Sequence, residues 1–200
     1  LYLKASILHK SIFNVLFYHL ITNTENKPMH HKHFLNAANH FSPEQINLIS
    51  NTAEKALIEI HRFLPKIRLD IIFMHSPIST VPKESIGGRT TDKSTIFIYF
   101  DLNSSNIVAS IEEKLKKVIA HEYHHASRWA TVGYGSTLGE ALVTEGLADH
   151  FSLEVFGGNA PRWCCALNET DKTLLFNKAT KEYHKEKYDH AAWFFGTNPN

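Results

Sequence analysis

The sequence contains almost no cysteine, no excess of charge of either sign and no long hydrophobic run. Cys164 and Cys165 are its two cysteines, and because they are adjacent they are badly placed to bridge each other. This leaves no secreted disulfide framework and favours a reducing, cytoplasmic compartment. Lysine and arginine total 21 against 20 for aspartate and glutamate, a net charge of about +1. No basic surface is therefore expected to hold nucleic acid or an anionic membrane.

The most apolar segment, residues 11–21, is too short to span a membrane. It is interrupted by Asn14 and His19, whereas a spanning helix needs roughly 20 apolar residues. We expect a packed or interfacial amino-terminal helix there and no transmembrane span. Residues 22–40 are polar and without periodicity, so they are interpreted as a linker. The chain is thus divided into residues 1–40, of uncertain role, and a main domain at 41–200.

Three histidines in this linker, His30, His31 and His33, could bind a metal ion. No second pair of ligands at metal-site spacing accompanies them, so a solvated stretch is the favoured interpretation. The chain has 14 histidines in all, which makes accidental histidine motifs more frequent. Each histidine cluster therefore has to be tested by its spacing.

The main domain shows regular signals for helices and strands. Ser42, Pro43 and Gln45 form a helix start, and helical spacing of apolar residues continues until Pro65. Strands are expected at 68–75 and 94–100, with a turn-rich segment around Gly87 and Gly88 between them. The remaining signals predict a helix from a capping box at Ser110 to about residue 130, one from Thr137 to Gly157, and one over 171–187.

The helix expected from Ser110 to about residue 130 carries an HExxH motif, with His121, Glu122 and His125. Histidines at positions i and i+4 project from one face of a helix, one turn apart, so both imidazoles can reach one zinc ion at about 2.0 Å. Glu122 is the next residue along and can stand beside a metal-bound water. Apolar residues at core spacing on the same helix place the histidines at the border of a buried stripe, so a solvated histidine face is disfavoured.

Two acidic residues in the following helix can complete the site. Glu145 follows the motif after a short glycine-containing connection, which lets the two helices fold back on each other. Asp149 lies one turn later on the same face and can accept the second ring N–H of a liganding histidine. The alternative is an exposed acidic pair, but this helix is apolar nearly all round, and buried carboxylates need a partner such as a cation.

Two histidines, one glutamate and an open position for water form the ligand set of catalytic zinc. Glu122 is then the general base, and a second donor is needed for the oxyanion that forms on the substrate. Tyr188 and His190, in the late aromatic segment, are the candidates for this donor; packing or capping a turn is an equally open role for them.

These motifs resemble those of the gluzincins, whose pattern is HExxH followed in a later helix by ExxxD. More narrowly, the chain is similar to a bacterial family of predicted Zn-dependent proteases long filed as a domain of unknown function. The similarity is carried by HEYHHASR at 121–128, EALVTEGLADHF at 140–151 and YDHAAWFFG at 188–196, and upstream by IGGRT at 86–90. It covers about residues 41–200, and because members continue past WFFG, it implies a chain truncated at its carboxyl end.

The resemblance implies an α+β, zincin-like fold: a small mixed sheet with the active-site helix, and a mostly helical second half. It also implies that a peptide or protein substrate lies extended along the sheet edge at Ile86 to Thr91. The expected function is that of a zinc metallopeptidase. A non-catalytic zinc-binding module is the first alternative, against which an intact Glu122 argues. A zinc amidohydrolase acting on a small substrate would use the same residues and stays open.

Overall fold

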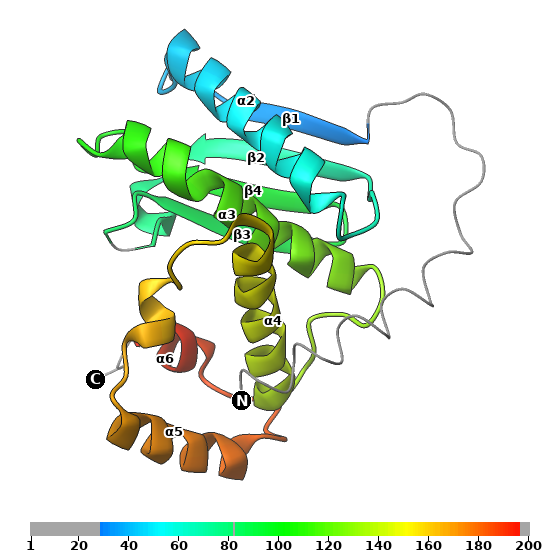
Figure 1. Ribbon diagram of the computed structural model, residues 1–200, viewed down its shortest axis with the longest axis vertical. Helices are drawn as coiled ribbons and strands as arrows, with labels where there is room; N and C mark the ends of the chain where they lie inside the picture. Colours follow the sequence, from blue (N-terminus) through cyan, green and yellow to red (C-terminus); the bar gives the residue numbers. More distant parts are fainter. Residues whose placement is uncertain (1–28, 82, 197–200) are drawn as a thin grey trace.

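The computed structural model describes residues 29–81 and 83–196 of the chain (Figure 1). The helix predicted at 11–21 lies outside them. The strands are β1 (His30–Leu35), β2 (Leu69–His75), β3 (Ile86–Asp92) and β4 (Thr95–Phe100). The α-helices are α2 (Pro43–Ile60), α3 (Ile107–Trp129), α4 (Leu138–Phe156), α5 (Glu169–Glu182) and α6 (His190–Phe195), with 3-10 turns at Pro77–Ser79 and Arg162–Cys165. The predicted α+β class, with a small sheet and a mostly helical second half, is confirmed.

The four strands form one mixed sheet in the order β1-β2-β4-β3 (Figure 1). The β1/β2 and β2/β4 pairs are parallel, whereas β3 runs antiparallel to β4 and forms one edge of the sheet. Every second residue of the central strands is buried, as expected where one sheet face is covered. These residues are Leu69, Ile71 and Phe73 on β2 and Ile96, Ile98 and Phe100 on β4.

Helices α2 and α3 lie across one face of the sheet, and α4 leads away from it (Figure 1). The predicted capping box at the start of α2 is present: the Ser42 hydroxyl accepts from the Gln45 N–H, and the Gln45 side chain accepts from the Ser42 N–H. Apolar residues one turn apart on α2 pack with those of α3 and the inner sheet face to form the core. Burying one such leucine or isoleucine stabilises the fold by about 1.5–3 kcal/mol. None of the described helices is long and apolar enough to cross a membrane.

The linker interpretation is wrong for residues 30–35, which form β1 and pair with β2 along their whole length. The inward positions of β1 are His30, Lys32 and Phe34, so the alternation is hidden when histidine and lysine are counted as polar. His30 stacks on His61 with 4.8 Å between ring centroids. Burial lowers the pKa of His61 to about 4 and also lowers the pKa of His30, so both rings remain uncharged at neutral pH. The sheet therefore includes residues placed before the predicted boundary at 41.

Two other local predictions are corrected. The segment around Gly87 and Gly88 is part of strand β3 and not a turn. Glycine occurs in this strand because other groups pack closely on its backbone: a Cβ at Gly87 would lie 2.5 Å from the backbone oxygen of Ser79. Helix α3 begins at Ile107, so Ser110 lies inside the helix and is buried instead of capping it. The box at Thr137 does start α4, as predicted. The last predicted helix, 171–187, is α5, and its N-cap is Asn168.

Candidate metal centre

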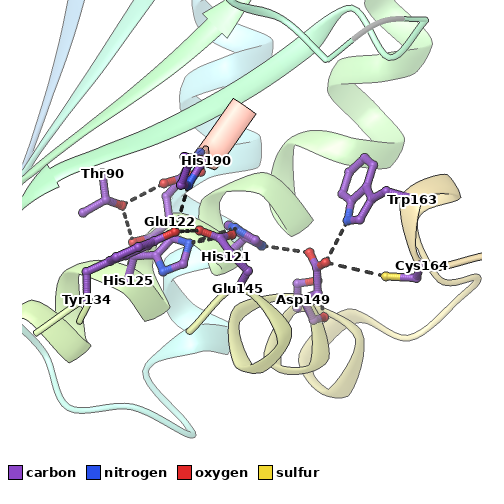
Figure 2. A network of polar contacts seen from close by, with 11 residues as sticks. Thr90, His121, Glu122, His125, Tyr134, Glu145, Asp149, Trp163, Cys164 and His190 are labelled. Carbon is purple, nitrogen blue, oxygen red and sulfur yellow. Dashed lines mark hydrogen bonds and ion pairs between the residues drawn. The ribbon is translucent and has the colours of Figure 1, made fainter. Parts of the chain in front are cut away.

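Helices α3 and α4 bring the three predicted ligands together (Figure 2). His121 and His125 lie one turn apart on α3, and their Nε2 atoms are 3.0 Å apart. Packing of α4 on α3 places the Glu145 Oε2 atom 3.2 Å from Nε2 of His121 and 3.3 Å from Nε2 of His125. The His125 side chain is 6% exposed and that of His121 is 19% exposed, so the donors converge at the margin of the core.

The spacing of these three atoms fits a zinc ion. In a tetrahedral site with metal-to-ligand distances of about 2.0–2.1 Å, neighbouring ligand atoms are separated by about 3.3 Å. The three separations between the Nε2 and Oε2 atoms, 3.0 to 3.3 Å, are close to that value. Within the described residues, this is the one group of three or more His, Cys, Asp and Glu side chains that could hold a metal ion. The histidines of β1 are not part of it.

The same contacts set the charges of the cluster. Burial alone lowers the pKa of His121, but its hydrogen bonds with Asp149 and Glu145 outweigh burial and raise that pKa well above its ordinary value. Burial alone raises the pKa of Glu145, but hydrogen bonds with His121 and His125 lower it far below its usual range. Glu145 is therefore an anion in the folded protein, and a cation held by the three ligand atoms could replace the proton that these contacts favour on His121.

Asp149 supports His121 from the side away from Glu145. Its Oδ1 atom lies 2.9 Å from Nδ1 of His121, so the imidazole can donate its Nδ1 proton there and keep the Nε2 lone pair for a metal. The other carboxylate oxygen accepts from the indole N–H of Trp163 at 2.7 Å and from the thiol of Cys164 at 3.6 Å (Figure 2). No sequence pattern points to Trp163 as part of this group. By contrast, the buried Nδ1 atom of His125 has no hydrogen-bond partner among the described residues.

Glu122 is turned from the motif toward strand β3. It is 5% exposed, and its Oε2 atom accepts a hydrogen bond of 2.7 Å from the hydroxyl of Thr90. A Cβ at Gly88 would lie 2.5 Å from Oε1 of Glu122, so only glycine leaves room for this carboxylate. The carboxylate of Glu122, the residue that follows His121, is therefore buried in contact with β3, the edge strand of the sheet.

A tyrosine that sequence reasoning missed reaches the centre from the α3/α4 connection. The hydroxyl of Tyr134 donates to Oε1 of Glu145 at 2.6 Å and lies 3.2 Å from Nε2 of His190. Gly133 and Gly135 flank it with φ of 80° and 102°, so both adopt backbone conformations that favour glycine. The sequence signal for Tyr134 is an aromatic residue between two glycines in the connection between the two helices. Burial, then the Glu145 carboxylate, raises the pKa of Tyr134, which keeps its proton.

Of the two residues predicted as oxyanion donors, His190 contacts this group through Tyr134. Tyr188 lies beside His190, with 6.1 Å between ring centroids. Burial, followed by the charge of Glu145, raises the pKa of Tyr188, so Tyr188 also lies within electrostatic reach of the centre. The backbone N–H groups of Leu138 and Gly139 donate to the carbonyls of Lys185 and Tyr183, which fastens this late segment to the start of α4.

Comparison with known proteins gives two matches. The family described as "Predicted Zn-dependent protease (DUF2268)" matches residues 45–200. The "Uncharacterized protein YjfC" of Bacillus subtilis (strain 168) is 28% identical over 120 residues. That alignment covers 54% of this chain and 38% of the Bacillus protein, so the chain spans well under half the length of this curated relative. No solved structure matches.

Proposed function

Since the chain belongs to the DUF2268 family of predicted Zn-dependent proteases, we propose that it is a zinc metallopeptidase of the gluzincin type. In this proposal His121, His125 and Glu145 hold one zinc ion, and Glu122 is the general base. The observation that carries it is the triangle of two imidazole nitrogens and one carboxylate oxygen with sides of 3.0 to 3.3 Å. The helical second half and the edge strand beside the motif helix support a zincin-like version of the α+β fold.

The chain's own residues divide the work of peptide hydrolysis. Zinc, when bound, supplies Lewis acidity that lowers the pKa of a water toward about 7 and polarises the substrate carbonyl. Glu122 takes the proton from the attacking water and then passes it to the leaving amine, as a carboxylate of this kind does in general acid–base catalysis. A binding module with no catalytic role has no use for a buried carboxylate at this position, which favours the enzyme over the non-catalytic alternative.

Tyr134 is the better supported donor for the negative charge that develops on the carbonyl oxygen. Its hydroxyl contacts Glu145, a proposed ligand, and it stays protonated. When a substrate oxygen enters beside the ligands, the hydroxyl can turn from Glu145 to that oxygen over a short distance. His190 then lies within hydrogen-bond reach of the tyrosine oxygen and orients it. Tyr188 remains a second candidate through its position next to His190.

We predict that Tyr134→Phe lowers kcat by about 10²- to 10³-fold, the usual cost of removing one donor to an oxyanion. KM and zinc content should change little, because Phe keeps the aromatic ring and leaves the three proposed zinc ligands in place. Steady-state kinetics on a cleaved peptide checks this, with Tyr188→Phe as the matched control. A larger loss in Tyr188→Phe than in Tyr134→Phe would reverse the assignment.

The substrate we propose is a peptide or protein bound in extended form. Strand β3 is an edge strand whose antiparallel partner, β4, occupies one side only. The carbonyl of Ile86 already accepts from the Val81 N–H at 3.2 Å. Beyond Ile86, the other side of β3 offers backbone groups that an extended peptide can pair with, which is the common mode of strand addition. The edge at Ile86 to Thr91 is continuous with the Thr90 contact to Glu122, so a peptide laid along it would pass the proposed base. A small amide remains the alternative substrate.

Asp149→Asn is expected to weaken both zinc affinity and turnover by about 10- to 100-fold, as loss of such a support usually does. Asparagine has one acceptor oxygen, so it cannot accept from both His121 and Trp163 as the carboxylate does. Competition with a chelator measures the affinity. Trp163→Phe, which removes one of the two donors to Asp149, should show a smaller loss of the same kind. An unchanged affinity, or a loss as complete as removal of a ligand, would contradict the assignment.

The function as a whole is tested by zinc analysis together with digestion of a broad peptide library. Wild-type protein should contain about one zinc ion per chain and cleave peptides, and a chelator should abolish cleavage. Zinc binding without cleavage of any peptide would favour the binding module. Cleavage confined to small amides would favour the amidohydrolase. The Glu122→Gln variant separates hydrolysis by this site from a contaminating protease.

A further inference from the structure

We propose that Thr90 is a positioning residue for the carboxylate of Glu122. Its hydroxyl holds one carboxylate oxygen against strand β3 and leaves the other as the oxygen that acts as the base. This inference rests on the proposed function and adds to it a residue on a different element from the motif helix. Helix α3 crosses the sheet beside its edge strand β3, and the two elements are in contact there (Figure 1).

Two residues of β3 at i and i+2, on the same face of the strand, form the holder. At Gly88, an added Cβ would lie 2.5, 2.6 and 2.9 Å from Oε1, Cγ and Cδ of Glu122, so the glycine makes space for the whole carboxylate. At Thr90, the hydroxyl oxygen lies 2.7 Å from Oε2 of Glu122 (Figure 2). The strand thus presents a space and a donor to the same side chain, two residues apart as strand alternation requires.

The hydroxyl proton of Thr90 has two acceptors within reach. Besides Oε2 at 2.7 Å, the backbone oxygen of Glu122 lies at 2.9 Å. That backbone oxygen lies inside helix α3, where carbonyls already accept an N–H from four residues later, whereas the carboxylate is charged and forms the stronger bond. The proton therefore goes to Oε2. Among the described residues, Thr90 is the hydrogen-bond donor that contacts this carboxylate, so Oε1 remains free to accept.

Such fixing matters because a glutamate side chain has several rotatable bonds. A base must come within about 2.6–3.2 Å of the proton that it takes, and misplacement by about 1 Å can cost about 10²-fold in rate. Glu122 is 5% exposed, so removal of the Thr90 hydroxyl would leave a buried carboxylate oxygen without its hydrogen bond, which is itself unfavourable. A role in packing alone would depend on the volume of Thr90 and not on its hydroxyl. Valine and serine separate these two roles.

The test compares Thr90→Val, which keeps the volume, with Thr90→Ser, which keeps the hydroxyl. We expect Thr90→Val to lower kcat by about 10- to 100-fold while KM and zinc content stay within about twofold. Thr90→Ser should retain kcat within about threefold. In a Glu122→Gln background, Thr90→Val should add no further loss, because there is no base left to place. Thr95→Val, the same change on the neighbouring strand, is the matched control and should leave kcat unchanged.

Equal losses in the valine and serine variants would overturn the proposal, as would loss of zinc in Thr90→Val. A second measurement does not depend on activity. In zinc-free protein, the unfolding midpoints of Thr90→Val, Glu122→Ala and the double variant should be non-additive, since the two side chains are in contact. If the wild-type protein hydrolyses nothing, the proposed function fails and this cycle decides whether Thr90 holds Glu122. Additive effects in the cycle would overturn the contact.

Discussion

Glu122→Gln should leave a folded protein with about one zinc ion per chain that hydrolyses peptides about 10²- to 10⁴-fold more slowly than the wild type. Removal of a general base costs this much because the amide cannot take the proton of the attacking water. The substitution keeps the size of the side chain. The amide oxygen can still accept from Thr90 at the position of Oε2, so the side chain should remain in the space above Gly88.

The proposed zinc ligands are separate side chains, so the variant isolates catalysis from metal binding. Zinc content by elemental analysis and secondary structure by circular dichroism are the controls that must match the wild type. The rate should be measured as kcat and KM on a peptide selected from the library digest. A loss in kcat with an unchanged KM indicates an interaction made only in the transition state. Cleavage at the wild-type rate would mean that Glu122 is not the base.

The residues of the site that the sequence predicted lie at fixed intervals along single helices. Spacing of four residues places His121 and His125 on one face of α3, and the same spacing places Glu145 and Asp149 on one face of α4. Helix geometry alone determines these relations, and the glycine-containing connection allows α4 to turn away from the sheet and still pack on α3 (Figure 1). In the structure Glu145 contacts both histidines, and Asp149 contacts His121.

The residues that the sequence did not predict are those whose role depends on tertiary contacts. Thr90 meets Glu122 only because β3 lies beside α3, Trp163 meets Asp149 only because a 3-10 turn folds back after α4, and Tyr134 lies in a connection with no period at all. Nothing in the local sequence distinguishes Thr90 or Trp163 from an ordinary threonine or tryptophan, and the glycines beside Tyr134 indicate only a turn. Polar contacts between distant elements need the packed structure to reveal them.

The strand β1 was missed for a different reason. Its inward positions include His30 and Lys32, which count as polar by type. Their environment makes them compatible with burial: His30 stacks on His61 and loses its charge, and Lys32 pairs with Glu54 at 2.8 Å. Alternation in the sequence is visible only when the partners are known. The capping-box pattern at Ser110 is misleading for a separate reason: helix α3 starts one turn earlier, so Ser110 lies inside it.

Glu145→Ala should abolish stable zinc binding, and with it the stabilisation that zinc gives to the folded protein. The variant leaves two imidazole ligands and removes the carboxylate whose pKa is lowered by its contacts with them, so that it is anionic in the cluster. A ligand that binds only the folded state stabilises it by about 2.7 kcal/mol at one hundred times its dissociation constant. Wild-type protein should therefore show an unfolding temperature that rises with added zinc, whereas Glu145→Ala should show almost no rise over the same range.

The matched control for this prediction is Glu154→Ala, the same change on the same helix at a position whose neighbour is His150. It should keep one zinc ion per chain and the full zinc-dependent rise. His121→Ala and His125→Ala should behave like Glu145→Ala, because each of the three side chains supplies one corner of the triangle. Full retention of zinc in Glu145→Ala would falsify the gluzincin ligand set, since the two histidines would then hold the ion without the carboxylate from α4. Partial retention of zinc in Glu145→Ala, together with normal zinc binding in Tyr134→Phe, would mean that another carboxylate replaces Glu145 as a ligand. Asp149 of α4, which already contacts His121, is the nearest candidate.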